Sequence, residues 1–519
     1  MRRAIMSSLL ALVLHPDAAH AAWLEASSAH FVVYTDDTES DLRRFSERLE
    51  RYHAAMAAVT TNRAPEPSPS NRVTVYVVRS EEAFRELHGG KNRFVGGFYI
   101  PQAGGSFAIV PQVSSGPNTM GTSMTVLLHE YAHHFLISSS SMSAPRWFTE
   151  GSAEFFAACS FKSDGSVMLG MAAQHRAPEL FNAPDVKVAD LLDSTEYDKR
   201  KRRNYDAFYG KSWLLYHYLT FNRPRDGQLT RYLDLLAQGK GLREAALTAF
   251  GDFDVLEREL EHYMRQRLTA LDLPASMVKI GPIALRRLSA GEAAMMPVRI
   301  RSRRGVMREQ ATALIGQARA IAARFPSDPA VLSALAEAEY DAGNDKEAIA
   351  AADTALAADP SQVNAYIQKG YALFRMAEDA KDSAGAYRRA RAPFIALNRR
   401  ENDHPIPLIY FYRSFTEQGQ QPTQLAIDGL IQAMTIAPFD LGLRMTLAMQ
   451  LIQSGRQVEA GIVLKPVAFS PHGEGLADQA RRLLARLASE PTWRGDDMGS
   501  VLAGPAEAGE RSPDGASTP

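Results

Sequence analysis

The chain has 519 residues, which is too long for one hydrophobic core and indicates two to four domains. With 45% hydrophobic and 23% charged residues, its composition is that of an ordinary folded protein. The formal net charge of -1 gives no global preference for nucleic acid or an anionic membrane, so we expect no nucleic-acid partner.

The N-terminal segment predicts an export signal. Arg2 and Arg3 precede an apolar stretch from Ala4 to Leu14, and the end at Ala21 fits an A-x-A cleavage site. An uncleaved anchor is the alternative, but this stretch is too short to span a bilayer comfortably, and no other segment has about 18 uninterrupted apolar residues. We therefore predict a signal peptide over residues 1–21, no transmembrane segment after its removal, and a periplasmic or secreted protein.

The segment after the signal predicts a small sheet followed by helices. Stretches rich in β-branched and aromatic residues predict strands at 29–34, 72–78, 94–100 and 106–110. Apolar residues at helical spacing predict a helix over 41–59, and after residue 120 the pattern is mainly helical. This order predicts an α+β domain over residues 22–274.

The second half predicts helical repeats. Residues 275–305 are predicted to be a connector that ends in a cluster of arginines. From 306 to 494, small and apolar residues recur with a period near 34, and Pro360 and Pro438 close two of the units. The pattern resembles tetratricopeptide repeats; a plain helical bundle is the alternative. The tail over 495–519 is predicted to be disordered from its Gly, Pro, Ser and acidic residues.

One motif in the first domain points to chemistry, the run His129-Glu130-Tyr131-Ala132-His133. Residues four apart share one face of a helix, so both imidazoles can point at one ion. Zinc accepts such nitrogens at about 2.0–2.1 Å, and a catalytic site uses three protein ligands and a water. Glu130 has the place of the general base in the H-E-x-x-H pattern. Alone the pattern is weak, since a buried histidine pair on a helix is often structural.

A third ligand is predicted in the next helix, which starts near Pro145 and has Glu150 in its first turn. With His129 and His133, Glu150 would complete a His₂Glu zinc site. Glu154, one helical turn later, is placed to accept a hydrogen bond from a ligand imidazole and fix its tautomer. Compensation of the helix dipole is the alternative role for Glu150.

These two helices resemble the gluzincin metallopeptidases, in which an H-E-x-x-H helix precedes a helix with a Glu-Gly-x-Ala ligand motif. The run Glu150-Gly151-Ser152-Ala153 matches that motif. The run from Tyr209 to Ser212 is similar to the Tyr-x-Lys-Gly segment of the aminopeptidase branch, with serine in place of the last glycine. The resemblance implies that Tyr209 stabilises the oxyanion; a tyrosine packed beside Trp213 is the alternative.

The resemblance covers roughly residues 25–270, and with the signal and the repeats the chain looks like exported bacterial gluzincin-like proteins. It departs from the aminopeptidase branch at Gly104–Ile109, which has no acid to hold a substrate's free amine. That segment, read as a strand, would still suit strand addition by an extended substrate.

The sequence thus predicts an exported zinc endopeptidase with one catalytic Zn²⁺ and a peptide or protein substrate. The helical repeats are expected to recruit substrate or a protein partner. The competing hypothesis is a catalytically silent adaptor that combines a zinc domain with tetratricopeptide repeats.

Overall fold

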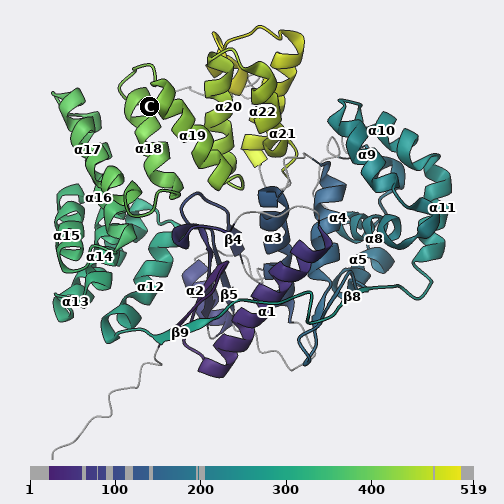
Figure 1. The fold of residues 1–519 in the computed structure, drawn as a ribbon, viewed down its shortest axis with the longest axis horizontal. Coiled ribbons are helices and arrows are strands. Elements are labelled where there is room, and N and C mark those ends of the chain that lie inside the picture. The colour runs from purple at the N-terminus through teal and green to yellow at the C-terminus, as the bar shows by residue number, and fades with distance from the viewer. Residues whose placement is uncertain are drawn as a thin grey trace, which may run out of the picture.

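The computed structural model describes residues 23–60, 66–78, 80–88, 98–111, 121–139, 144–193, 197, 205–470 and 474–503. The predicted signal peptide over 1–21 lies outside these residues. Figure 1 shows a sheet low in the centre of the view, helices beside it, and a long row of helices that rises on the left and ends above α3. Within the described residues, no helix is long and apolar enough to cross a membrane.

A six-stranded sheet forms the centre of the first half, in the order β4-β5-β3-β2-β1-β9. Its strands are β1 (Leu24–Ser27), β2 (Phe31–Thr35), β3 (Val73–Val78), β4 (Phe98–Ile100), β5 (Phe107–Pro111) and β9 (Ala284–Arg287). β2, β3 and β5 are parallel, and β1, β4 and β9 run antiparallel to their neighbours. A second, antiparallel sheet consists of β6 (Ser160–Phe161), β7 (Val167–Leu169) and β8 (Leu271–Leu273).

The strands predicted at 29–34, 72–78 and 106–110 are confirmed as β2, β3 and β5, and the end of the one at 94–100 as β4; residues 94–97 lie outside the described residues. The prediction that the strand in Gly104–Ile109 suits strand addition is wrong, because β5 already pairs with β3 on one side and β4 on the other. The short strand β4 is the edge of the sheet. Any added strand would therefore have to pair with β4.

Helices cover both faces of the sheet. The helices before residue 270 are α1 (Glu39–Val59), α2 (Glu81–His88), α3 (Thr122–Ser139), α4 (Arg146–Ala157), α5 (Ala177–Asn182), α6 (Val188–Leu192), α8 (Phe208–Phe221), α9 (Gln228–Ala237), α10 (Leu242–Phe250) and α11 (Phe253–Tyr263). Alternate strand residues such as Val75 and Ala108 join the core made with α1, α3 and α4. The Tyr52 hydroxyl of α1 donates to the Leu128 carbonyl of α3 at 3.0 Å, which fixes α3 over this face.

The prediction that residues 275–305 form a connector is wrong. β9 extends the sheet by pairing with β1, and α12 (Ala290–Arg304) starts with a capping box of Ser289 and Glu292. Met296 and Ile300 of α12 join the core on the second face of the sheet. The sequence predicts an exposed linker because arginines lie between these apolar residues. In the structure, the guanidinium of Arg299 packs 4.7 Å from the centre of the Tyr34 ring.

Antiparallel helix pairs form most of the described chain from residue 308 onward, as the repeat pattern predicts. They are α13 (Arg308–Arg324), α14 (Pro329–Asp341), α15 (Asp345–Ala358), α16 (Val363–Glu378), α17 (Ser383–Asn398), α18 (Pro405–Thr416), α19 (Gln424–Ile436), α20 (Leu441–Gln453), α21 (Gln457–Ala468) and α22 (Glu474–Ser489). A Cβ atom on Gly370 would lie 2.2 Å from the Phe394 ring, so the small residue allows α16 and α17 to pack closely. Part of the predicted disordered tail is helical, since α23 spans Met498–Ala503.

The helical array is docked on the first domain near β4 and α3. The backbone and hydroxyl of Ser70 donate to the Glu401 carboxylate at 3.0 and 2.8 Å. Beyond β4, the Ala103 amide donates to Asp440 Oδ2 at 2.9 Å. The Phe439 ring packs against that of His134 of α3, with centroids 4.4 Å apart. These contacts hold the array against the helix that carries the H-E-x-x-H motif (Figure 1).

Truncation after Ala270 is expected to abolish cooperative folding of the first domain, because it removes β8, β9 and α12 and uncovers one apolar face of the sheet. A chain ending at Arg304 keeps these elements and is the matched comparison. Thermal melts followed by circular dichroism should show a cooperative transition for the longer chain alone. Equal transitions for both chains would show that β9 and α12 add no stability.

Candidate metal centre

The site is built on two neighbouring helices. α3 buries Leu128 and Tyr131 against the sheet domain, so the opposite stripe with His129 and His133 faces α4. α4 starts after Pro145, whose fixed φ suits a helix start, and its Trp147 is fully buried. This packing sets Glu150, the fifth residue of α4, beside the histidines.

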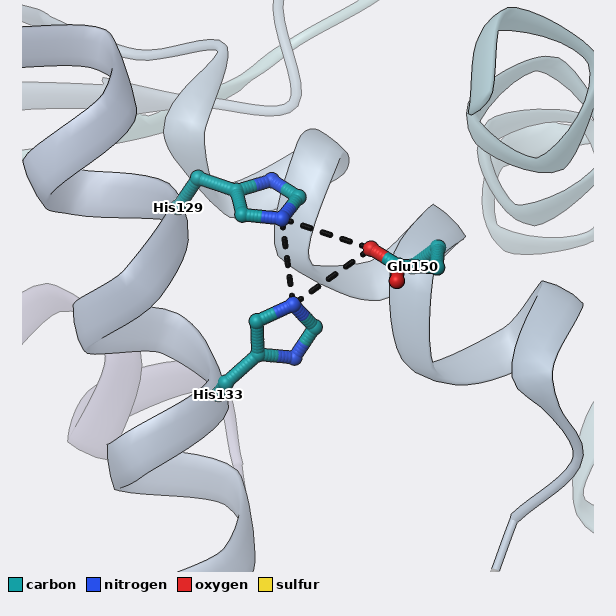
Figure 2. Close-up of side chains that lie close together, drawn as sticks. All are labelled: His129, His133 and Glu150. Atoms are coloured by element: carbon teal, nitrogen blue, oxygen red, sulfur yellow. Dashed lines mark hydrogen bonds and ion pairs between the residues drawn. The ribbon is translucent and has the colours of Figure 1, made fainter. Parts of the chain in front are cut away.

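The structure brings His129, His133 and Glu150 together, as the sequence predicts. The two histidine Nε2 atoms lie 3.0 Å apart, and Glu150 Oε2 lies 3.3 Å from that of His129 and 3.4 Å from that of His133. Figure 2 shows both imidazoles and the carboxylate pointing at one another from α3 and α4. Within the described residues, this is the one group of His, Cys, Asp or Glu side chains placed to hold a metal ion.

The spacing of the three atoms fits a tetrahedral ion. Ligands about 2.0–2.1 Å from a tetrahedral zinc lie roughly 3.3 Å from one another. The observed separations of 3.0, 3.3 and 3.4 Å bracket that value. Two nitrogen donors and one carboxylate oxygen, with a fourth direction left for water, are the donor set of catalytic zinc sites. The residues present therefore fit a zinc ion.

Because Glu150 is buried, its negative charge is unfavourable unless a cation lies beside it. Glu150 is fully buried, and neither of its oxygens accepts a well-aligned hydrogen bond in the described part of the chain. Burial opposes its charge, but contacts with His129 and His133 hold its pKa well below the usual range. Burial likewise opposes a charged His129, and Glu150 and Glu154 outweigh it and raise the His129 pKa to about 10. The pocket is thus arranged to stabilise positive charge.

Glu154 lies beside Nδ1 of His129, the position predicted for a carboxylate that fixes the tautomer of a ligand imidazole. Its Oε1 atom is 3.1 Å from His129 Nδ1, on the side of the ring away from Glu150. His175 Nε2 lies 2.5 Å from its Oε2, and Arg176 Nε donates to its Oε1 at 2.9 Å. His175 and Arg176 could not be predicted from the sequence, because they lie in a short 3₁₀ turn 21 and 22 residues beyond Glu154 and no motif surrounds them.

Glu154→Gln is expected to weaken zinc affinity about 10- to 100-fold, because the carboxylate orients His129 and raises its basicity. Competition with a zinc-responsive chelating dye measures the change. Glu244→Gln, an exposed carboxylate on α10 far along the chain, is the control and should keep full affinity. Unchanged affinity in Glu154→Gln would leave that carboxylate with a purely structural role.

Glu130 lies between the two histidines on α3 and is partly exposed. Burial, together with the negative charge of Glu130, raises the pKa of Tyr99 in the edge strand β4. The Tyr99 hydroxyl lies 2.5 Å from Nδ1 of His134. Burial lowers the pKa of His134 to about 3, so this imidazole is neutral. His134 thus ties α3 to β4 and to the helical array and is not one of the three converging side chains.

Tyr209 lies at the start of α8, close enough for the Glu150 charge to act on it. Burial raises the pKa of its hydroxyl, with Glu150 adding to the effect, so the group stays a neutral hydrogen-bond donor. The guanidinium of Arg176 lies 4.8 Å from the centre of its ring. Lys211, in the same motif, is buried and forms an ion pair with Asp185 at 3.1 Å. This pairing gives Lys211 a role in stabilising the fold.

No protein-family model and no curated protein matches this chain. Among solved structures, one match is a protein described as a thermophilic TPR protein from Thermus thermophilus. The two are 19% identical, the match covers 34% of this chain and 92% of that chain, and the TM-score is 0.30. The helix pairs from α13 to α22 by themselves form an array of helical repeats.

Proposed function

We propose that this chain is an exported zinc-dependent peptidase, and an endopeptidase rather than an exopeptidase. His129, His133 and Glu150 would hold the ion. The observation that supports the proposal is the convergence of three buried donor atoms 3.0 to 3.4 Å apart beside the glutamate of an H-E-x-x-H helix. The lack of an acid in Gly104–Ile109 is the reason to prefer an endopeptidase.

The chemistry follows from these side chains. A zinc ion held there supplies a Lewis acid for the scissile carbonyl and makes water acidic near neutral pH. A carboxylate oxygen of Glu130 takes the proton from the attacking water and passes it to the leaving nitrogen. Glu154 would keep the His129 ring in one tautomer, which leaves Nε2 on the side of Glu150 free to bind the ion.

Tyr209 is proposed to donate a hydrogen bond to the oxyanion. Tyr209→Phe removes the donor and keeps the ring, which has the guanidinium groups of Arg176 and Arg146 4.8 and 5.9 Å from its centre. We therefore expect kcat to fall about 10²- to 10³-fold with unchanged zinc content. Steady-state kinetics on a fluorogenic peptide measures the loss. Wild-type kcat in this variant would make Tyr209 a packing residue.

The helical array is proposed to recruit a protein substrate or partner to the cleft. Stacked helix pairs with tetratricopeptide-like spacing offer an extended surface for peptides, and tethering raises the effective concentration of a bound protein. The array is fixed beside α3 and β4 by Phe439 and Asp440, so a protein bound there would lie near the site. Stabilisation of the first domain is the competing role for the same contacts.

His129→Ala is the experiment that separates the peptidase from a silent adaptor. Wild-type protein is expected to contain one zinc per chain and to cleave peptides, whereas the variant should lose both while keeping its fold. Elemental analysis and a peptide digest measure the two properties. Stoichiometric zinc in the wild type without cleavage of any peptide would favour the adaptor.

A further inference from the structure

The start of α8, which carries Tyr209, packs closely against α5 and the 3₁₀ turn before it. The buried Gly210 amide donates to Oε2 of Glu179 in α5 at 3.1 Å. A Cβ atom on Gly210 would lie 2.8 Å from Cγ of Leu180 and 3.4 Å from the backbone oxygen of Arg176. The glycine next to Tyr209 therefore allows the close approach of the two segments. Figure 1 shows α5 and α8 beside α4.

Arg176 joins this contact to the metal centre. Its Nε and Nη2 atoms donate to Oε1 of Glu154 at 2.9 and 2.5 Å, and its Nη1 atom donates to Oε1 of Glu179 at 2.6 Å. The two carboxylates are buried, with 1% and 5% of their surface exposed. Glu154 also lies 3.1 Å from Nδ1 of His129. One guanidinium thus connects the carboxylate beside a predicted metal ligand to the carboxylate that holds the Gly210 amide.

The same guanidinium also contacts Tyr209 directly. Its Cζ atom lies over the Tyr209 ring, 4.8 Å from the ring centre, where a cation is attracted by the aromatic face. An arginine suits this place because its planar group offers donors along its edges and a face for stacking, whereas a lysine ammonium is a point charge. The ring of Tyr209 and the amide of the next residue are therefore both held by the segment that carries Arg176.

We propose that Arg176 is a positioning residue that fixes His129 and Tyr209 relative to each other. It acts on His129 through Glu154. It acts on Tyr209 through Glu179 and through its own contact with the ring. Groups that act on one substrate atom have to be held within about 0.5 Å of the productive geometry, which a shared anchor achieves. The inference rests on the peptidase function proposed above, in which the metal ligands and Tyr209 act on the same substrate oxygen.

Arg176→Ala in the full chain tests the proposal. Zinc affinity, measured by competition with a chelating dye, is expected to fall about tenfold, because Glu154 loses one of its anchors and keeps only His175 besides His129. At saturating zinc, kcat on a fluorogenic peptide is expected to fall by up to about 10²-fold with little change in KM, as for a group displaced by about 1 Å. Guanidinium ion at non-denaturing concentrations should restore part of kcat, since the arginine side chain is 25% exposed and its place is accessible. Zinc affinity and kcat equal to those of wild type would overturn the proposal.

Glu179→Gln separates the two arms of this network. An amide has one acceptor oxygen, so it cannot accept from both Arg176 and Gly210 as the carboxylate does. We expect kcat to fall while zinc affinity stays unchanged, because Glu154 keeps its arginine. This variant decides the question if Arg176→Ala does not fold. Wild-type kcat in Glu179→Gln would refute the link between Arg176 and Tyr209.

Arg319→Ala is the matched control, because Arg319 of α13 makes a similar two-bond pair with Glu339 at 2.7 and 2.8 Å within the helical array. It should keep zinc affinity and kcat and show no response to guanidinium. Hydrogen exchange in the metal-free protein reports on the second arm without catalysis, and the Gly210 amide should exchange faster in Arg176→Ala. If the wild type binds zinc but cleaves no peptide, the proposed function fails, and zinc affinity and the exchange rate still decide whether Arg176 positions both residues. Unchanged values of both in Arg176→Ala would contradict that role.

Discussion

Glu130→Gln is expected to keep one zinc per chain and to lose peptide hydrolysis by about 10²- to 10⁴-fold, the range that general acid–base catalysis typically contributes. The amide has nearly the same shape but cannot take a proton from water. Glu130 is not among the three side chains that converge on the metal position, so the ligand set is untouched. Zinc content by elemental analysis and initial rates on one peptide measure the two effects in the same sample.

The control for this variant is Glu261→Gln, an exposed carboxylate on α11 outside the site, which should retain wild-type rates. Full activity in Glu130→Gln would remove this residue from the mechanism. Loss of zinc together with activity would instead make Glu130 part of the metal-binding set.

Gly151→Ala is expected to lower both stability and zinc affinity more than any other addition of one methyl group near the site. A Cβ atom at Gly151 would lie 2.4 Å from the backbone oxygen of Ser212 in α8, a distance that real Cβ atoms essentially never show. Relief requires α4 and α8 to move apart, which displaces the adjacent ligand Glu150. Overpacking of this kind costs about 1–3 kcal/mol, and a shift of the helix would also weaken zinc binding. Thermal melts and chelator competition measure both.

Gly316→Ala provides the matched control, because nothing lies within 4 Å of a Cβ atom there in α13. It should be neutral or stabilising by up to about 1 kcal/mol, the difference in helix propensity between the two residues. Wild-type stability and zinc affinity in Gly151→Ala would show that α4 and α8 do not pack as closely as described.

The two helices of the site could be predicted from sequence because their signals are local. Helical spacing alone places His129 and His133 on one face. The start of the next helix near Pro145 is confirmed, but the helix begins at Arg146, so Glu150 is its fifth residue and lies beyond the first turn predicted for it. The structure adds the reason for the glycine in the Glu-Gly-x-Ala run, which is the close approach of α8 to Gly151. That reason depends on a helix about 60 residues further along the chain and leaves no local signal.

The features that sequence reasoning missed all depend on distant contacts. β9 pairs with β1 across some 260 residues, and its short exposed sequence, Ala284–Arg287, carries little strand signal. His175 and Arg176 acquire their role only when their turn packs against Glu154. The contact of Phe439 with His134, which docks the array, likewise has no periodic sequence pattern that would predict it.

We propose metal-dependent hydrolysis of peptide bonds at His129, His133 and Glu150. Its most direct test is a mass-spectrometric cleavage profile of a peptide library incubated with the full chain as purified, after chelation, and after zinc is restored. We predict internal cleavages that disappear on chelation and return with zinc. One bound zinc per chain with no cleavage in any sample, or cleavages that survive complete metal removal, would contradict the account.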